Sequence, residues 1–436
     1  MRSGHAGRQV FLFLQGPITP FFAEVADALE ARGHKALRIN LCYGDSLFWR
    51  RGGATDYRGP LEAWPAFVSE FLDSRGVTDL VLLGEQRFYH KVAVAAAKAR
   101  NIRVTVTDFG YLRPDWITLE PDGMSGDSAF PREPDAIRAL AAAAPEPDLT
   151  VKYGDSFFTQ AVWDMAYHLS SSLLSFRYPG YRSHQVHHPA FVYLGTGLHF
   201  LRAKRGHKRA NRLIQSVRES GVPYWVFPLQ MENDFQLRAY SPYPDLKTPI
   251  HEVIRSFAAN APADARLLVK IHPLDPGMRN WGRLVRRSAA NWGVRNRVDF
   301  LDGGQLDTLL DGARGVVTVN STVGLWGLRS GKPLITLGAA VFDIEGLAFK
   351  GHLDRFWAEA QPPDQELLTA FIRAIASEIQ IRGVYYGREG LSAAVRAAAD
   401  RLDLAAQTNP SVLRQEVSQA GPEDAQALEP DRASVA

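Results

Sequence analysis

Polar residues that could together hold an anion follow three short apolar runs in the second half of the chain. The runs cover residues 224–229, 267–271 and 315–319, and each is typical of a buried strand. The polar residues are Gln230 after the first run, Lys270, His272 and Pro273 around the end of the second, and Asn320, Ser321 and Thr322 after the third. Hydroxyl and backbone N–H groups at a helix start bind phosphate, but serine and threonine also cap helices without any ligand. Their occurrence together with the lysine and histidine favours a phosphate site.

Carboxylates supply candidates for a catalytic base or nucleophile. Asp234 lies in the polar stretch 230–236, directly after a strand-like run, where a carboxylate can accept a proton or attack carbon. A solvated acidic loop is the ordinary alternative. Comparable strand-end positions in the first half are Gln15, Gly16, Glu85 and Asp108, followed by Arg113 and Glu120. Glu85 or Glu120 could be the acid/base partner and Arg113 could meet an anionic acceptor, with structural roles left open for each.

Strand-like and helix-like patterns alternate through both halves, which predicts an α/β protein with parallel sheets. We expect two Rossmann-like domains that face a cleft, at residues 8–190 and 210–345, with the second holding a nucleotide. Helices at 350–405 are expected to pack back across the domains, and residues 406–436 to form a disordered tail. In such sheets ligands bind beyond the carboxyl ends of strands, where the polar residues above are placed.

Several classes of protein are disfavoured by motifs and composition. Neither half contains GxGxxG or a P-loop, which argues against a dinucleotide enzyme or an NTPase. A net charge of +3 is too small to indicate nucleic acid as a partner. The single cysteine suits a reducing cytoplasm and excludes a cysteine-based metal site, and no apolar stretch is long enough to span a bilayer. We expect a cytoplasmic protein without a metal or other cofactor, which could rest on a membrane surface.

One basic segment falls between the two expected domains. Residues 177–210 contain five histidines and many lysines and arginines, and their pattern predicts an irregular connector. The histidine spacing matches no helical pair of metal ligands accompanied by an acid. A basic face could meet phosphates or anionic lipid, although a run of charge is usually only solvated.

A set of motifs in fixed order resembles the capsule polysaccharide biosynthesis/export family, and most closely its KpsS/LipB branch. The motifs are FLQGP, DFGYLRPDWITLE, VFPLQMENDFQ, KIHPLD, VNSTVGL and GKP, and the resemblance covers roughly residues 8 to 400. It implies a GT-B-like glycosyltransferase fold and a retaining β-Kdo transferase (Kdo is an eight-carbon sugar with a carboxylate). The implied donor substrate is CMP-Kdo. The implied acceptor is lyso-phosphatidylglycerol, on which the linker of a capsular polysaccharide begins.

The resemblance also implies roles for individual residues. His272, Pro273, Ser321 and Thr322 would hold the CMP part of the donor, Lys270 would add positive charge, and Asp234 would be the nucleophile. It further implies contact with the inner membrane and with other capsule assembly proteins. Two alternatives remain: another CMP- or CDP-donor transferase, of the sialyl or glycerophosphate type, and a non-catalytic capsule assembly or export scaffold.

Overall fold

A computed structural model describes residues 8–183, 189–232 and 235–407 of the chain. These residues form two compact units, each built from separate stretches of sequence. Of the described residues, the first unit contains 8–119, 151–182 and 381–407, and the second contains those of 120–150 and 183–380. The continuous ranges expected from the sequence, 8–190 and 210–345, therefore differ from the observed units in two places.

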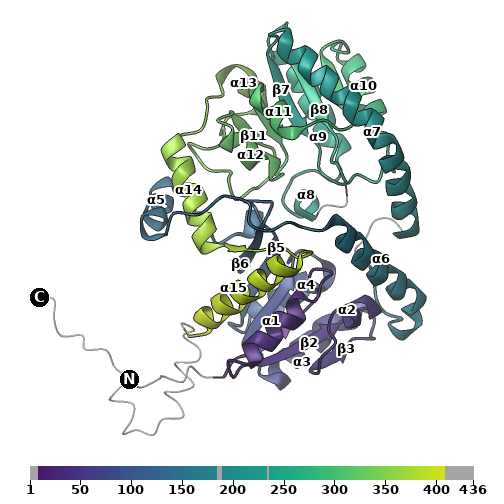
Figure 1. Cartoon of the computed structure of the whole chain (residues 1–436), viewed down its shortest axis with the longest axis vertical. Helices are drawn as coiled ribbons and strands as arrows, with labels where there is room; N and C mark the ends of the chain where they lie inside the picture. The colour runs from purple at the N-terminus through teal and green to yellow at the C-terminus, as the bar shows by residue number, and fades with distance from the viewer. Residues whose placement is uncertain (1–7, 184–188, 233–234, 408–436) are drawn as a thin grey trace, which may run out of the picture. The chain divides into compact units, whose positions relative to one another are not determined.

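Side-chain packing explains both differences. Helix α5 (Pro134–Ala143) packs on α14 (Gln365–Glu378), and Arg373 of α14 donates to the carbonyl oxygen of Ala144, so residues 120–150 join the second unit. Helix α15 (Arg388–Gln407) packs on α1 (Phe21–Glu30) and completes the core of the first unit. Figure 1 shows both pairs of helices. The C-terminal helices are thus divided between the units.

The first unit is organised around a seven-stranded sheet with the order β12-β6-β5-β4-β1-β2-β3. Its strands are β1 (Val10–Phe13), β2 (Lys35–Asn40), β3 (Ala54–Asp56), β4 (Asp79–Leu83), β5 (Arg103–Phe109), β6 (Trp116–Pro121) and β12 (Gln380–Arg382). The pairs from β3 through β5 are parallel, and Phe11 of β1 lies beside Ala36 on one neighbour and Asp79 on the other. The order from β3 to β6 is the Rossmann order, which confirms the expected fold for this part of the chain.

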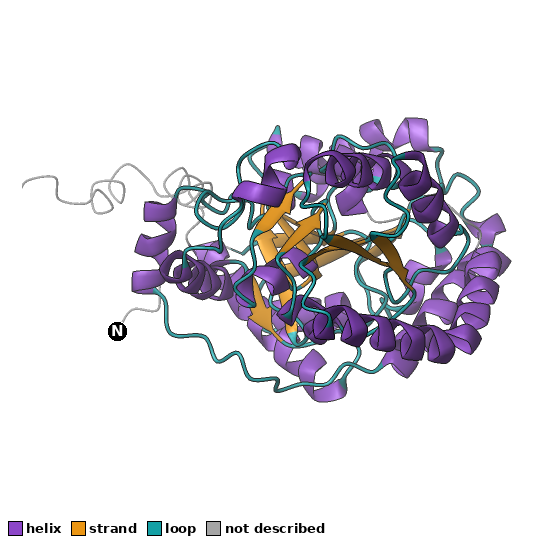
Figure 2. Cartoon of the chain, turned by 90° about the horizontal axis from the view of Figure 1, so that it is seen from above, coloured by secondary structure: helices purple, strands orange, loops and turns teal. Residues whose placement is uncertain are grey.

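Helices α2 (Tyr43–Leu47), α3 (Trp64–Arg75), α4 (Phe88–Lys98) and α6 (Phe157–Leu173) complete the first unit. Helix α6 packs on α2, the helix that follows the end of β2. Most strand residues are buried, as expected when helices cover both faces of a parallel sheet. Figure 2 shows the strands inside and the helices around them.

The second unit contains a five-stranded parallel sheet with the order β11-β10-β7-β8-β9. The strands are β7 (Tyr224–Pro228), β8 (Arg266–Lys270), β9 (Val298–Leu301), β10 (Gly315–Thr318) and β11 (Leu334–Thr336). The remaining helices are α7 (Pro189–Glu219), α8 (Phe235–Ala239), α9 (Lys247–Asn260), α10 (Trp281–Asn291), α11 (Leu306–Asp311), α12 (Val323–Arg329) and α13 (Leu353–Glu359).

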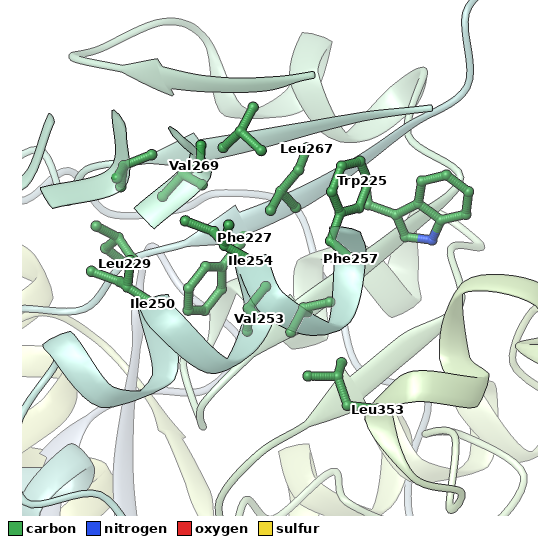
Figure 3. Packing of buried hydrophobic residues seen from close by; sticks show 14 of the residues in the cluster. Trp225, Phe227, Leu229, Ile250, Val253, Ile254, Phe257, Leu267, Val269 and Leu353 are labelled. Atoms are coloured by element: carbon green, nitrogen blue, oxygen red, sulfur yellow. The ribbon is translucent and has the colours of Figure 1, made fainter. Parts of the chain in front are cut away.

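The core of the second unit forms where α9 covers β7 and β8. Ile250, Ile254 and Phe257 lie on one face of α9 and pack against Phe227 of β7 and Val269 of β8. Figure 3 shows these side chains interlocking between the helix and the strands. Residues on one face of a helix recur every three or four positions, so one apolar stripe is enough to cover the sheet.

The structure corrects the expectation for the basic segment 177–210. From Pro189 onward this segment belongs to the long helix α7. Histidine and the basic residues are tolerated in helices, so a basic composition does not by itself indicate a loop. Of the predicted tail, residues 406 and 407 still belong to α15, and residues 408–436 lie outside the described part of the chain.

Candidate functional site

The topological switch point of the second sheet lies between β7 and β10. The chain adds β8 and β9 on one side of β7, and then β10 and β11 on the other. Sheets of this kind bind ligands beyond the carboxyl ends of the strands at this point. Gln230 follows β7 and Asn320 follows β10, so two of the predicted donor-binding residues flank the switch point.

Gln230 and Asn320 are bonded to each other. The Gln230 side-chain amide donates to Asn320 Oδ1 at 2.8 Å, and the Asn320 backbone N–H donates to Gln230 Oε1 at 3.2 Å. Both side chains are buried. A buried amide is costly unless it is hydrogen-bonded, so this exchange fixes how the two strand ends sit beside each other. The pair is positioned to shape the site, and the polar groups around it can contact a ligand.

The turn after β10 presents two hydroxyl groups. The Ser321 N–H donates to Thr318 Oγ1 at 3.1 Å, and the Val323 N–H donates to Ser321 Oγ at 3.3 Å. Ser321 therefore also serves the local turn, as the capping alternative predicts. Ser321 and Thr322 are both half-buried, and a serine hydroxyl that accepts one bond can still donate its own proton. Helix α12 has seven residues, so these hydroxyls matter more for binding than its dipole.

Lys270 brings a buried positive charge to the end of β8. Its backbone lies beside Pro228 of β7, and its side chain is almost wholly buried. Burial lowers the pKa of Lys270, and the carboxylate of Asp302 partly opposes this shift. Among the described residues, none forms an ion pair with its ammonium group. A phosphate or carboxylate group of a ligand would compensate this charge.

His272 and the loop after it are held in a defined arrangement. The Leu274 N–H donates to His272 Nδ1 at 3.1 Å, so in the neutral ring Nε2 carries the proton and acts as a donor. Asp275 anchors the loop because its carboxylate accepts from the Gly277 N–H at 2.8 Å and from Trp281 Nε1 at 3.0 Å. Pro273 is exposed on the same loop. The sequence interpretation overlooked Asp275, although an aspartate just before a Pro-Gly pair is a turn signal.

The predicted nucleophile Asp234 lies outside the described residues, so its role stays a prediction. Its neighbour Glu232 is described and forms an ion pair with Arg279, with 2.7 Å between Oε2 and Nε. Of the two acids in the stretch 230–236, Asp234 remains the candidate.

Gln15 and Gly16 lie at the switch point of the first sheet, between β1 and β4. The Gln15 side chain is buried, and its Nε2 lies 3.0 Å from the hydroxyl of Tyr167 and 3.2 Å from Asp45 Oδ2. Position 16 requires glycine for a steric reason, since a Cβ there would lie 2.4 Å from the ring of Phe22. Both residues therefore shape the edge of the sheet from beneath the surface.

A buried polar network surrounds Gln15 and was not foreseen from the sequence. Arg38 donates to the carbonyl oxygen of Leu14 at 2.5 Å and lies 3.5 Å from Asp45. Asp45 also accepts from Tyr167 Oη at 3.0 Å. Burial lowers the pKa of Arg38, and the aspartate opposes this shift. The one local signal is the spacing between Cys42 and Asp45, which form a capping box at the start of α2.

Glu85 follows β4 and is nearly fully buried. The turn that carries it is fixed by His90, whose Nδ1 lies 3.0 Å from the carbonyl oxygen of Leu83 and 2.9 Å from that of Gly84. Burial lowers the pKa of His90 to about 3, so the ring is neutral at pH 7 and donates through Nδ1. This arrangement positions Glu85 and leaves its acid/base role as a prediction.

The three other predicted residues of the first half lie in different surroundings. Asp108 is half-buried at the end of β5; burial raises its pKa, while the N–H of Phe109 and the charges of Arg113 and Arg87 oppose the shift. Arg113 is exposed and lies over the Phe109 ring, with 5.0 Å to its centre. Glu120 has no exposed surface and accepts from Ser128 Oγ at 2.5 Å, which favours a structural role.

Two further properties concern metals and membranes. In the part of the chain that the structure describes, no three or more His, Cys, Asp and Glu side chains are grouped as metal ligands. None of the helices in the same residues is both long and apolar enough to cross a membrane.

Residues 78–386 match the family described as capsule polysaccharide biosynthesis protein. The chain is 32% identical over 388 residues to the capsule polysaccharide export protein KpsS of Escherichia coli, covering 86% of this chain and 96% of that protein. It is 30% identical over 389 residues to the capsule polysaccharide modification protein LipB of Neisseria meningitidis serogroup B, covering 86% and 91%. Among solved structures, the β-Kdo 2,7 transferase KpsC of Thermosulfurimonas dismutans aligns with a TM-score of 0.42 and 12% identity, over 91% of this chain and 100% of that one.

Proposed function

The chain belongs to the capsule polysaccharide biosynthesis family, and we propose that it is a glycosyltransferase that uses CMP-Kdo as donor. The observation that carries the proposal is the polar edge of the second sheet. Lys270 ends one strand of a parallel sheet, His272 follows the same strand, and Ser321 and Thr322 follow another. The Gln230–Asn320 pair fixes the switch point of this sheet. A lysine charge, an imidazole donor and two hydroxyls suit the phosphate of a nucleotide sugar.

In the proposed reaction the donor is held mainly by hydrogen bonds and charge. The Nε2–H of His272 and the hydroxyls of Ser321 and Thr322 donate to the phosphate oxygens, and Lys270 compensates their negative charge. These contacts become stronger as CMP departs, because negative charge then collects on the phosphate. Asp275 acts indirectly, since it holds the loop that aims His272. The chemistry needs no metal ion in this scheme.

Asp234 is the proposed nucleophile. Its carboxylate attacks the anomeric carbon of Kdo, the bond to the CMP phosphate breaks, and a glycosyl-enzyme ester forms. An acceptor hydroxyl then attacks the same carbon and releases the carboxylate, while a base accepts the hydroxyl proton. Two inversions at one carbon give net retention. Glu85 is the favoured acid/base candidate over Glu120, whose carboxyl group is completely buried and bonded to Ser128.

The proposed acceptor is lyso-phosphatidylglycerol, so the reaction would start the linker of a capsular polysaccharide. This places the protein on the cytoplasmic side of the inner membrane, in contact with lipid and with other capsule assembly proteins. Gln15, Gly16, Asp108 and Arg113 are the proposed residues on the acceptor side. Arg113 is the exposed cation in this set and suits the phosphate of the acceptor.

The direct test is intact-mass measurement of the protein after incubation with CMP-Kdo. We expect a Kdo adduct on Asp234 that disappears when lyso-phosphatidylglycerol is added, and no adduct in Asp234→Ala. A folded Asp234→Ala variant with full transferase activity would refute the nucleophile assignment. Consumption of CDP-glycerol or CMP-sialic acid instead of CMP-Kdo would favour the other transferases, and no turnover of any donor would favour a scaffold.

His272→Ala tests the donor site separately, with His352→Ala as a matched control. His352 accepts a backbone N–H at Nδ1 in the same way, from Asp354 at 3.3 Å, but it precedes α13 instead of following a strand. We expect CMP to bind at least ~10-fold more weakly to His272→Ala, as for the loss of one charge-assisted hydrogen bond. Equal affinities of the two variants would remove His272 from the donor site.

A further inference from the structure

Helix α6 of the first unit carries a strip of exposed apolar side chains along one face. The exposed fractions are Phe158 77%, Val162 39%, Met165 45%, Leu169 60% and Leu173 68%, followed by Phe176 at 74% in the short turn after the helix. The spacing of three or four positions places all of them on one side. Single exposed apolar residues are ordinary on a protein surface, whereas a continuous strip of this kind marks an interaction surface.

The opposite face of α6 is held against the protein. Tyr167 is buried and donates to Asp45 Oδ1 at 3.0 Å, while Ser171 Oγ accepts from the Gly44 N–H at 3.0 Å. Trp163 on the same face packs against the core of the first unit. A Cβ on Gly44 would lie 2.5 Å from the Tyr167 ring, so the helix approaches the backbone of α2 closely. Helix α6 thus has a packed face of its own, and these contacts prevent it from rotating to bury the strip.

The charges around the strip have one dominant sign. Between residues 156 and 183 the only acid is Asp164, which is half-buried and pairs with His168 at 3.6 Å. Arg177 and Arg182 are exposed just beyond the helix. Arg182 lies 3.6 Å from Glu62, but an exposed pair of this kind contributes little and is readily exchanged. An apolar strip with cations beside it complements a bilayer surface, where anionic headgroups lie above apolar acyl chains.

A single exposed helix suits a bilayer surface. Helix α6 has 17 residues and is therefore about 25 Å long. Insertion into lipid needs no matching partner surface, because each side chain enters the acyl region independently and a helix can lie at the headgroup boundary. The arginines beside the strip make anionic headgroups its complementary occupant.

We infer that the strip Phe158–Val162–Met165–Leu169–Leu173–Phe176 is a membrane-docking surface that lies flat on a phospholipid bilayer containing anionic lipid. Arg177 and Arg182 contact the headgroups beside it. This inference extends the proposed function, since it names the surface that would bring the enzyme to a lipid acceptor.

The test is co-sedimentation of the full chain with vesicles of phosphatidylcholine alone or with phosphatidylglycerol added. We expect binding that strengthens with phosphatidylglycerol. The triple variant Phe158→Gln, Leu169→Gln, Leu173→Gln should bind at least ~100-fold more weakly, because three large side chains lose their transfer into lipid. Glutamine has a helix propensity close to that of leucine, and unchanged thermal unfolding checks the fold. A matched control replaces three exposed apolar residues elsewhere: Leu149→Gln, Trp292→Gln and Leu404→Gln.

The inference is overturned if the wild type does not bind vesicles, or if the triple variant binds as well as the control. It is also overturned if the wild type is a dimer that the triple variant dissociates, since a second copy would then cover the strip. An activity arm compares lyso-phosphatidylglycerol in vesicles with its water-soluble headgroup, glycerophosphoglycerol, as acceptors. The docking surface is supported if the triple variant loses turnover with vesicles but keeps it with glycerophosphoglycerol. Absence of turnover with both acceptors in the wild type refutes the proposed function, while vesicle binding still decides the docking surface.

Discussion

The hydrogen bonds of the Gln230–Asn320 pair predict how much stability is lost when either residue is replaced by alanine, and which replacement costs more. Gln230→Ala removes the partner of two Asn320 groups, the side-chain carbonyl and the backbone N–H. Asn320→Ala removes the side-chain bond and a long, weak one of 3.5 Å from Nδ2 to the carbonyl oxygen of Tyr240, but leaves the backbone N–H bonded to Gln230. At about 1–2 kcal/mol for each buried group left without a partner, we expect a loss of about 2–4 kcal/mol for Gln230→Ala and about 1–2 kcal/mol for Asn320→Ala.

The double variant measures the shared bond. It should cost about 1 kcal/mol less than the sum of the single variants, because the 2.8 Å bond between the side chains can be lost only once. Hydrogen exchange of the β7 and β10 amides is the suitable assay, since it reports the free energy of opening at the switch point itself. Global unfolding of a chain with two compact units need not be two-state.

An exposed glutamine in the same unit provides the control. The Gln305 side chain accepts from the Thr308 hydroxyl at the surface, at 3.2 Å, while its backbone bonds do not depend on the side chain. Gln305→Ala should therefore change the opening free energy by less than about 0.5 kcal/mol. Additive effects of the two single variants would show that the pair is not coupled. A larger cost for Asn320→Ala than for Gln230→Ala would refute the assignment of the backbone bond.

Three further variants test the surroundings of the candidate sites. Lys270→Met should weaken CMP binding yet keep or raise stability near pH 7. Burial lowers the pKa of Lys270 in the folded state, so wild-type stability rises with pH toward the ordinary lysine pKa of about 10.4. The stability gained by Lys270→Met, measured by urea unfolding, should therefore shrink at higher pH. Asp45→Asn leaves the Arg38 charge buried without its counter-charge and should lower the opening free energy of the β1 and β2 amides by about 2–4 kcal/mol in hydrogen exchange. Gly16→Ala places a Cβ against an aromatic ring of α1 and should lower the melting temperature through a cost of about 1–3 kcal/mol, whereas Gly52→Ala, with open space around it, should not.

Long periodic segments allowed much of the fold to be predicted. The apolar runs that became β1, β4, β7, β8 and β10 are buried in the sheets, and the alternation with helices confirmed two Rossmann-like units. The short strands β3 and β12 were not predicted, because their sequences ATD and QIR are not apolar runs, whereas the equally short β11, LIT, lies in one. The course of residues 120–150 depends on α5 meeting α14, a contact between segments more than two hundred residues apart, which no local pattern encodes.

The candidate donor site was predicted more completely than the first-half site. Lys270 ends β8, His272 follows it within two residues, and Ser321 lies three residues after β10; parallel strands bring their carboxyl ends to one edge. The network of Arg38, Asp45 and Tyr167 joins residues from β2, α2 and α6. Its members are individually ordinary polar residues, and only packing reveals that they are buried together.

The sequence by itself determined the sheet-forming runs, the polar residues after them and the family, because these depend on local spacing and on order along the chain. Tertiary structure alone decided which of those residues bond to one another, such as Gln230 with Asn320, and which are buried, as Glu85 and Glu120 are. It also decided which face of α6 is exposed: the sequence predicts a helix with mixed aromatic and apolar faces, but burial depends on what each face contacts. Periodicity defines a face of a helix, and only its partners determine whether that face meets protein or its surroundings.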